Sequence, residues 1–305
     1  MYEAGLKSSD ERMIVRESTA SKMSVVKIYL INLDRDRERL SWMDRQLLAR
    51  GLDYERFPAL TPETVPDRIA GRFHERARDV LLPNNIAGFA SHLAVAERLL
   101  TSEEPFCLVL EDDVEIVGPA DELRAIGAKC IPYDILKLND WPKTPTLEID
   151  STGAFRIVRY LQVPRGAGSY FLTRHGAKKL LERAVGLAIS TDNFIRAEAY
   201  LHLDIAGVTP PPITQDRFGT SSLDPAKLRG KARNRRYFYD AQSPTGAWTR
   251  AIQMVRQLGA ANVARLQIAR VVMKAKGVKR DVQSRYVLKA GGRGRFKTEG
   301  KPIAV

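Results

Sequence analysis

Hydrophobic runs alternate with amphipathic segments through most of the chain. Residues 25–33, VVKIYLINL, form an apolar run rich in β-branched side chains, which predicts a short buried strand. Over residues 34–51 the apolar positions recur at helical spacing and the segment ends at Gly51, so we expect a helix. Residues 53–60 predict a second strand. A strand, a helix and a strand in succession favour a parallel sheet covered by helices.

This alternation continues to about residue 224. A polar connection precedes a helical pattern that Asn84 or Asn85 can cap, and residues 141–155 are rich in turn formers. A helix capped by Thr173 follows, and another helix is expected to start in 191–207. Further strands are predicted over 106–116, 133–140, 156–163 and 167–173.

Three consecutive carboxylates, Glu111, Asp112 and Asp113, follow the most apolar of these strands. Adjacent acids repel one another, so the cluster is unfavourable unless water or a cation screens it. A solvated strand exit is the simplest interpretation. However, Mg²⁺ and Mn²⁺ bind one or two carboxylates together with substrate phosphates, and ligands of α/β sheets bind at the carboxyl ends of strands. The triplet therefore also predicts a metal–diphosphate site.

Charge divides the chain into two parts. Residues 225–305 contain 20 lysines and arginines against three acids, a net charge of +17, whereas the whole chain carries +13. Residues 1–224 are therefore mildly acidic, at −4. Within the basic part, residues 245–276 predict an amphipathic helix or helix pair, which can lie on an anionic membrane or pack against the body or a partner. Basic regions of this kind favour phosphate-bearing partners.

Several classes of protein are disfavoured. No apolar run reaches the length of a membrane-spanning helix, and residues 1–24 form a polar leader without the apolar core of a signal peptide. Two cysteines, Cys107 and Cys130, make no disulfide framework, so a reducing cytoplasm is the expected compartment. The first strand is not followed by GxGxxG, so the usual dinucleotide-binding fingerprint is missing.

A set of short motifs occurs in order between residues 25 and 224 and together resembles glycosyltransferase family 25, the lipopolysaccharide-biosynthesis and collagen-galactosyltransferase-like group. The motifs are INLDRDRER (31–39), ASHLAV (90–95), LVLEDDVEI (108–116), SYFLTRHGAKKLL (169–181), TDNF (191–194) and PPPITQD (210–216). The resemblance implies a GT-A-type fold, in which a Rossmann-like mixed α/β sheet is flanked by helices. It also implies a nucleotide-sugar donor, a Mn²⁺ or Mg²⁺ ion, and inversion at the anomeric carbon.

The resemblance also suggests roles for individual residues. Asp113 would be the first metal ligand, with Asp112 or Glu111 as a second contact or a brace. Asp192 would be the base that takes the acceptor hydroxyl proton, and His92 would lie in the catalytic pocket, although each has a simpler role as a helix cap or a structural histidine. The residues expected to bind the donor are Asn32, Asp34, Arg35, Arg37, Ser91, Gly168, Tyr170 and Gln215.

One departure concerns the stretch before the Ser91–His92 pair. The family usually has Glu-x-Gly-Cys there, whereas this chain has Asn85-Ile86-Ala87-Gly88. Which donor or which acceptor this chain prefers therefore stays open. The expected organisation is a flexible leader (1–24), a GT-A-like domain (25–224) and a basic helical or disordered extension (225–305).

We predict a metal-dependent inverting glycosyltransferase that moves galactose or glucose from a UDP-sugar to a lipopolysaccharide or other surface-glycan acceptor. It would be cytoplasmic, and residues 225–305 would hold it peripherally on the inner face of the cytoplasmic membrane. A nucleotidyltransferase is one alternative, although no glycine-rich phosphate loop follows the first strand. A nucleic-acid-binding protein acting through RGKARNRRYFY and GGRGRF is another, but it would leave the acid triplet unexplained.

Overall fold

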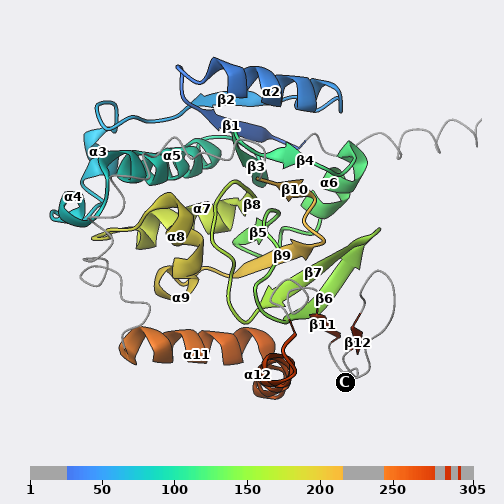
Figure 1. Cartoon of the computed structure of the whole chain (residues 1–305). Coiled ribbons are helices and arrows are strands. Elements are labelled where there is room, and N and C mark those ends of the chain that lie inside the picture. Colours follow the sequence, from blue (N-terminus) through green and yellow to red (C-terminus); the bar gives the residue numbers. More distant parts are fainter. Residues whose placement is uncertain (1–25, 216–243, 279–285, 290–294, 297–305) are drawn as a thin grey trace, which may run out of the picture.

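The computed structural model describes residues 26–215, 244–278, 286–289 and 295–296. Three predicted segments lie outside the described residues: the leader, the basic-aromatic stretch KLRGKARNRRYFY, and most of the glycine-rich C-terminus. The described part is a mixed sheet flanked by helices, which confirms the predicted fold class (Figure 1).

Ten strands of the described residues make one sheet, in which parallel and antiparallel pairs are mixed. β1 lies between β2 and β3 and is parallel to both, while β8 runs antiparallel between β3 and β5. In spatial order the strands are β12 (Arg295–Phe296), β11 (Tyr286–Lys289), β6 (Thr146–Thr152), β7 (Phe155–Tyr160), β9 (Ile205–Thr209), β5 (Ile135–Lys137), β8 (Ser169–Thr173), β3 (Phe106–Glu111), β1 (Ile28–Asn32) and β2 (Glu55–Pro58).

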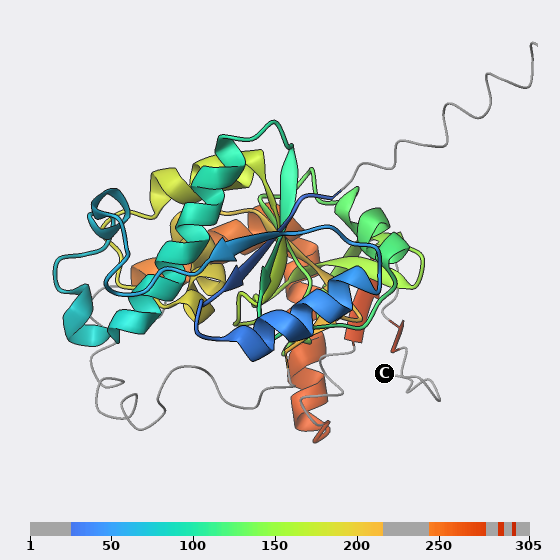
Figure 2. The same cartoon turned by 90° about the horizontal axis from the view of Figure 1, so that it is seen from above.

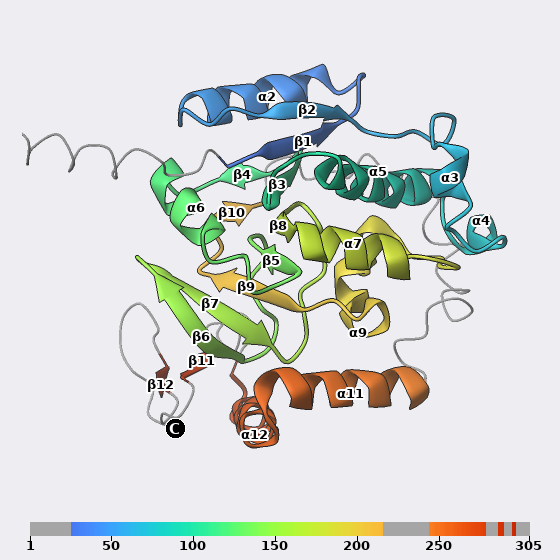
Figure 3. The same cartoon turned by 180° about the vertical axis from the view of Figure 1, so that it is seen from behind.

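Helices cover both faces of this sheet (Figures 2 and 3). One face carries α5 (Pro83–Leu100), α7 (Arg174–Arg183), α8 (Thr191–Phe194) and α9 (Glu198–Leu201). The other carries α2 (Arg37–Leu48) and α6 (Ala120–Gly127). The remaining short elements are α3 (Asp67–Ala70), α4 (Ala77–Val80), the 3₁₀ helix η1 (Ile195–Ala197), and the antiparallel pair β4 (Glu115–Ile116) and β10 (Ile213–Thr214).

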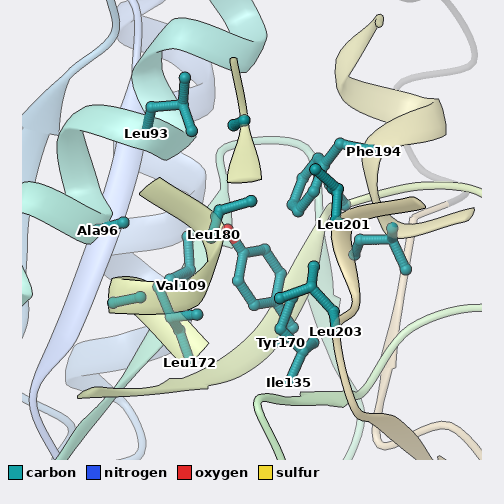
Figure 4. Close-up of a cluster of buried hydrophobic side chains, with 14 of the residues drawn as sticks. Leu93, Ala96, Val109, Ile135, Tyr170, Leu172, Leu180, Phe194, Leu201 and Leu203 are labelled. Carbon is teal, nitrogen blue, oxygen red and sulfur yellow. The ribbon is translucent and has the colours of Figure 1, made fainter. Parts of the chain in front are cut away.

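The central strands are buried on both faces, which explains their unbroken apolar sequences. In β1, Tyr29 and Ile31 enter the core under α5, whereas Ile28 and Leu30 enter the core under α2. Figure 4 shows the α5 side, where the ring of Tyr170 lies among aliphatic side chains from strands and helices.

Local signals predicted most of these elements, but β9 was not predicted, because 205–207 were assigned to the segment expected to start a helix, and two further predictions need correction. The stretch 141–155 was expected to form turns, but it contains β6, which pairs with β7 and reverses at Gly153. The predicted caps Asn84 and Asn85 are wrong, because α5 begins at Pro83 and both asparagines lie inside the helix. Proline favours the first helical position, where no amide donor is needed. The Thr173 cap is confirmed, since its hydroxyl accepts a hydrogen bond from the Gly176 amide.

The described residues of the C-terminal part pack against α9 and the sheet. α11 (Pro244–Leu258) lies against α9, α12 (Ala260–Ala275) follows it, and β11 pairs with β6. A third apolar cluster, formed by Leu147, Leu161, Leu258, Leu266, Met273 and Leu288, joins these elements. Within the described residues, no helix combines the length and apolar character that crossing a bilayer requires.

Glu198 is a buried carboxyl group at the start of α9, the helix that packs against α11. Its side chain is 8% exposed, and its Oε2 atom has no hydrogen-bond partner among the described residues. Burial raises the pKa of Glu198 to about 7, although the charges of Arg250 and Arg196 act in the opposite direction. The folded state therefore favours the protonated form of this side chain.

This burial predicts a pH-dependent stability. Between the unfolded pKa near 4.5 and the folded pKa near 7, the folded state binds more protons, so stability falls as pH rises. We expect Glu198→Gln to raise the free energy of unfolding by about 1–3 kcal/mol at pH 8 and by much less at pH 5. Urea unfolding at both pH values measures this difference. Glu103→Gln, at an exposed position, serves as the control, and an equal gain at both pH values would contradict the prediction.

Candidate active site at the carboxyl edge of the sheet

Several element ends meet at one edge of the sheet. β1 ends at Asn32, β3 ends at Glu111 and β5 ends at Lys137, and these three strands run in the same direction. β8 runs the opposite way, so it begins at this edge with Ser169. Gln215 arrives from far along the chain, directly after β10. Polar groups from distant parts of the sequence are therefore brought together at the position where α/β sheets bind ligands.

Glu111 and Asp113 converge on one amide group. The Gln215 Nε2 atom donates to Glu111 Oε2 at 3.0 Å and to Asp113 Oδ1 at 2.8 Å. Gly168 gives this side chain its space, because a Cβ atom there would lie only 2.7 Å from Gln215 Oε1. The described contacts thus give Gly168 a role in seating Gln215, where the sequence suggested contact with the donor sugar.

Asp112 is directed to a different set of partners. It is buried, accepts a hydrogen bond from Asn32 Nδ2 at 2.7 Å and pairs with Arg39 at 3.1 Å. The same guanidinium lies 3.6 Å from Asp113. Asp112 therefore braces the edge between β1 and α2 and is less available to a ligand than its two neighbours.

Arg39 is the arginine that the sequence interpretation missed. Arg35 and Arg37 were predicted to meet the donor, which stays a prediction, and the side chains of both are exposed near the start of α2. Asp34 is exposed too and pairs with Arg56, which also donates to Asn32 Oδ1 at 3.0 Å. Of the arginines on this segment, Arg39 is the one that contacts the acids.

His92 contacts Glu111 from α5. Its ring is buried on α5, with Nε2 3.1 Å from Glu111 Oε1 and Nδ1 2.8 Å from the Tyr170 hydroxyl. The ring also packs on Tyr170 and Phe194. This chain of contacts makes His92 and Tyr170 positioning residues for Glu111. Ser91 is likewise used internally, since its hydroxyl accepts from the Leu60 amide and donates to the Ala87 carbonyl.

A second polar group stands behind Gln215. The fully buried Lys137 ammonium contacts Asn139 Oδ1 at 2.8 Å, Asp140 Oδ2 at 3.1 Å and the Gly166 carbonyl at 2.5 Å. Asn139 donates in turn to Gln215 Oε1 at 3.3 Å. The sequence shows a lysine inside an apolar strand that is followed by Asn-Asp, but these residues were interpreted only as part of the strand.

Asp192, the predicted base, lies in the first turn of α8. The structure describes its backbone position and not its side chain. α8 lies close against α5, because a Cβ atom on Gly88 would come within 2.6 Å of Thr191 Oγ1. Phe194 of the same short helix contacts the His92 ring, with 5.4 Å between the ring centroids. The backbone of Asp192 is thus on the element that packs beside the acid edge, and its role as base stays a prediction.

The acids differ in their tendency to ionise. Burial, followed by the negative charge of Glu111, raises the pKa of Asp113 to about 6. Burial acts on Glu111 as well, but the hydrogen bonds from His92 and Gln215 outweigh it and lower the pKa of Glu111. Burial also raises the pKa of Asp112. Burial therefore disfavours the charged forms of Asp113 and Asp112, whereas the hydrogen bonds to Glu111 favour its charged form.

Comparison with known proteins identifies the family. The family model for glycosyltransferase family 25, described as a lipopolysaccharide-biosynthesis protein, matches residues 25–195, more than half of the chain. This chain belongs to glycosyltransferase family 25. A glycosyltransferase 25 family member from Anopheles gambiae is 27% identical over 209 residues, which cover 61% of this chain and 34% of that protein. Another, from Aedes aegypti, is 31% identical over 144 residues, or 41% of this chain and 23% of that protein.

These relatives are much longer proteins, since the chain spans about a third or less of their length. The family match covers β1 through α8, including the acid triplet and His92. Arg39 and Asn32 lie inside it as well. Lys137, Asn139 and Asp140 are also inside, whereas Gln215 lies beyond its end.

The acid edge of this family 25 chain suits a cation whose ligands come partly from the protein and partly from a substrate. Among the residues that the structure describes, no group of three or more acidic, histidine or cysteine side chains is arranged to hold a metal ion. Glu111 and Asp113, both bonded to one Gln215 amide, offer two carboxylates. Mg²⁺ and Mn²⁺ accept such a partial protein site when phosphate oxygens complete the coordination. The residues therefore fit a metal that arrives with a diphosphate.

The His92–Tyr170 contact yields a prediction for this family 25 site. Tyr170→Phe removes the hydroxyl that bonds His92 Nδ1 and leaves a buried ring nitrogen without this partner. We expect the free energy of unfolding to fall by about 1–2 kcal/mol. Tyr133→Phe is the matched control, because it keeps the ring over which the Arg159 guanidinium lies at 4.8 Å. Denaturant titration compares the free energies of unfolding of the two variants. Equal values would contradict a stabilising hydrogen bond between Tyr170 and His92.

Proposed function

We propose that this chain is a metal-dependent inverting glycosyltransferase. In this proposal it moves a hexose, galactose or glucose, from a UDP-sugar to a lipopolysaccharide or other surface-glycan acceptor. Membership of glycosyltransferase family 25 supports the reaction class, and the description of the family model supports the acceptor class. The observation that carries the proposal is the pair of carboxylates, Glu111 and Asp113, held together by Gln215 at the carboxyl edge of the sheet.

The charge of the site explains why a metal belongs to the proposal. A nucleotide-sugar brings a negatively charged diphosphate toward an edge that already carries acids, and like charges repel. A divalent cation bound by Asp113 and Glu111 would neutralise charge on the leaving nucleoside diphosphate. Asp112 would keep its present partners Asn32 and Arg39 and hold the segment after β3 in place.

Residues of this chain account for orientation and proton transfer. Arg39 stands beside Asp113 and would reach the diphosphate, because guanidinium groups bind phosphate oxygens in a bidentate manner. His92 and Tyr170 fix the Glu111 carboxylate. Inversion needs a base on the far side of the donor sugar, and Asp192 on α8 is the proposed group. Glu198 is a weaker candidate, since its side chain is buried.

The first test measures turnover of a panel of UDP-sugars with and without Mn²⁺. We expect Asp113→Asn and Glu111→Gln to lower metal-dependent turnover by about 10²–10³-fold, the range seen when one electrostatic contact to the reacting groups is lost. Asp121→Asn, with a side chain 85% exposed on α6, is the matched acidic control and should keep wild-type turnover.

The products distinguish the competing reaction class. Release of UDP supports sugar transfer, whereas release of pyrophosphate would support a nucleotidyltransferase. Failure of every donor to bind, with and without metal, would overturn the proposed function.

A second test separates Arg39 from the neighbouring arginines. Arg39→Gln removes the guanidinium from the acid edge, so we expect kcat/KM for the donor to fall by about 10–100-fold, mainly through KM. Arg35→Gln changes an exposed arginine four positions earlier and should have little effect. Steady-state kinetics at saturating Mn²⁺ compares the two variants. A larger loss of kcat/KM in Arg35→Gln than in Arg39→Gln would contradict the prediction and favour the arginines first predicted from the sequence.

A further inference from the structure

The helix pair α11–α12 carries apolar side chains on two sides. Its inner side packs into the third apolar cluster through Leu258, Leu266 and Met273. Its outer side leaves large apolar side chains exposed: Trp248, Ile252, Val255, Ile268 and Val271. The inner side is sufficient to attach the helices to the sheet, so the outer side requires a different explanation.

The exposed side chains form rows and are not scattered. Trp248, Ile252 and Val255 are four and three residues apart, which places them on one side of α11. Ile268 and Val271 are three apart on α12, and the exposed Ala264 and Ala275 extend that row. Trp248 is 71% exposed and Val271 is 65% exposed. Contiguous exposed apolar residues of this kind mark a contact surface.

Both helices lie along the same end of the molecule, opposite α2. In Figure 1, α11 runs across the page and α12 is seen end-on, and Figure 3 shows the same from behind. Figure 2, turned by 90°, shows α12 lengthwise. The two axes therefore lie close to one plane beneath the sheet, as expected for helices that rest on a surface rather than form a groove.

The charge of the pair has one sign. Residues 244–278 contain six lysines and arginines and no aspartate or glutamate. The exposed ones are Arg256, Arg270, Lys274 and Lys276. Such a surface is complementary to a partner that is anionic at its boundary and apolar beneath it.

We propose that the outer side of α11 and α12 docks on the surface of an anionic lipid bilayer. Nucleic acid would satisfy the cations but would leave the apolar rows in water. A bilayer satisfies both, and tryptophan is favoured at the depth of the headgroups. The proposal goes beyond the transferase reaction and rests on α11 and α12 alone, so donor turnover in solution does not depend on it.

Vesicle flotation of the full chain tests the docking. Wild type is expected to float with vesicles of phosphatidylcholine mixed with phosphatidylglycerol and not with phosphatidylcholine alone. Trp248→Ser combined with Val271→Ser should lower partitioning about tenfold or more, because two large apolar groups are lost. Arg256→Gln combined with Lys274→Gln should lower it about 5–25-fold.

A matched control changes exposed apolar residues elsewhere. Leu48→Ser combined with Val185→Ser alters side chains that are 62% and 55% exposed but lie outside α11 and α12, and vesicle binding should stay at the wild-type level. Trp248→Phe keeps an apolar group in the row, so it should still bind. It should also lose the blue shift in tryptophan fluorescence that we expect of wild type with anionic vesicles.

Three results would overturn the docking. Absence of wild-type flotation is the first, and equal binding to neutral and anionic vesicles is the second. The third is a dimer in sedimentation that forms without lipid and is abolished by the Trp248 and Val271 substitutions, which would assign the surface to a second copy of the chain. Unchanged UDP-sugar turnover in these variants keeps each outcome separate from failure of the proposed function.

Discussion

Negative charge at the carboxyl edge of the sheet is the constraint that the surrounding structure satisfies. Three successive carboxylates are withdrawn from full solvation, and each has to find donors nearby. The donors come from four separate places: Asn32 at the end of β1, Arg39 on α2, His92 on α5 and Gln215 after β10. The strand order, which places β3 beside β1 and β8, is what brings them within reach.

The elements that could be predicted from sequence are those whose own residues show an apolar pattern that follows from their burial. β1 and β3 are covered on both faces, so their apolar runs are continuous and easily recognised. β6 escaped because it contributes Leu147 to a small cluster and otherwise carries polar and exposed residues. It exists through its pairing with the adjacent strand β7 and with β11, and the β11 contact comes from a part of the chain that is distant in sequence.

The same distinction holds for the candidate site. The acid triplet was visible because three adjacent carboxylates after an apolar strand are unusual in themselves. Choosing Arg39 over Arg35 and Arg37 required knowing that α2 begins at residue 37, and a shift of two residues turns a different side chain toward the sheet. The resemblance placed Gln215 near the donor, but its contact with Glu111, 104 residues away, follows from topology alone. Asn139 and Lys137 support it from β5, where a hydrophobic pattern drew attention away from the polar residues.

For the proposed metal and donor, the balance of charge predicts how each affects the binding of the other. The described contacts to the three carboxylates include one guanidinium, Arg39, while Gln215 and Asn32 supply neutral amides. A diphosphate arriving alone would meet net repulsion, and a cation arriving alone would find two carboxylates instead of a full set of ligands. Each is therefore expected to bind more tightly in the presence of the other, and by linkage the two gains in affinity are equal. Under the proposed function, two carboxylates would hold the metal only while a donor supplies the remaining ligands.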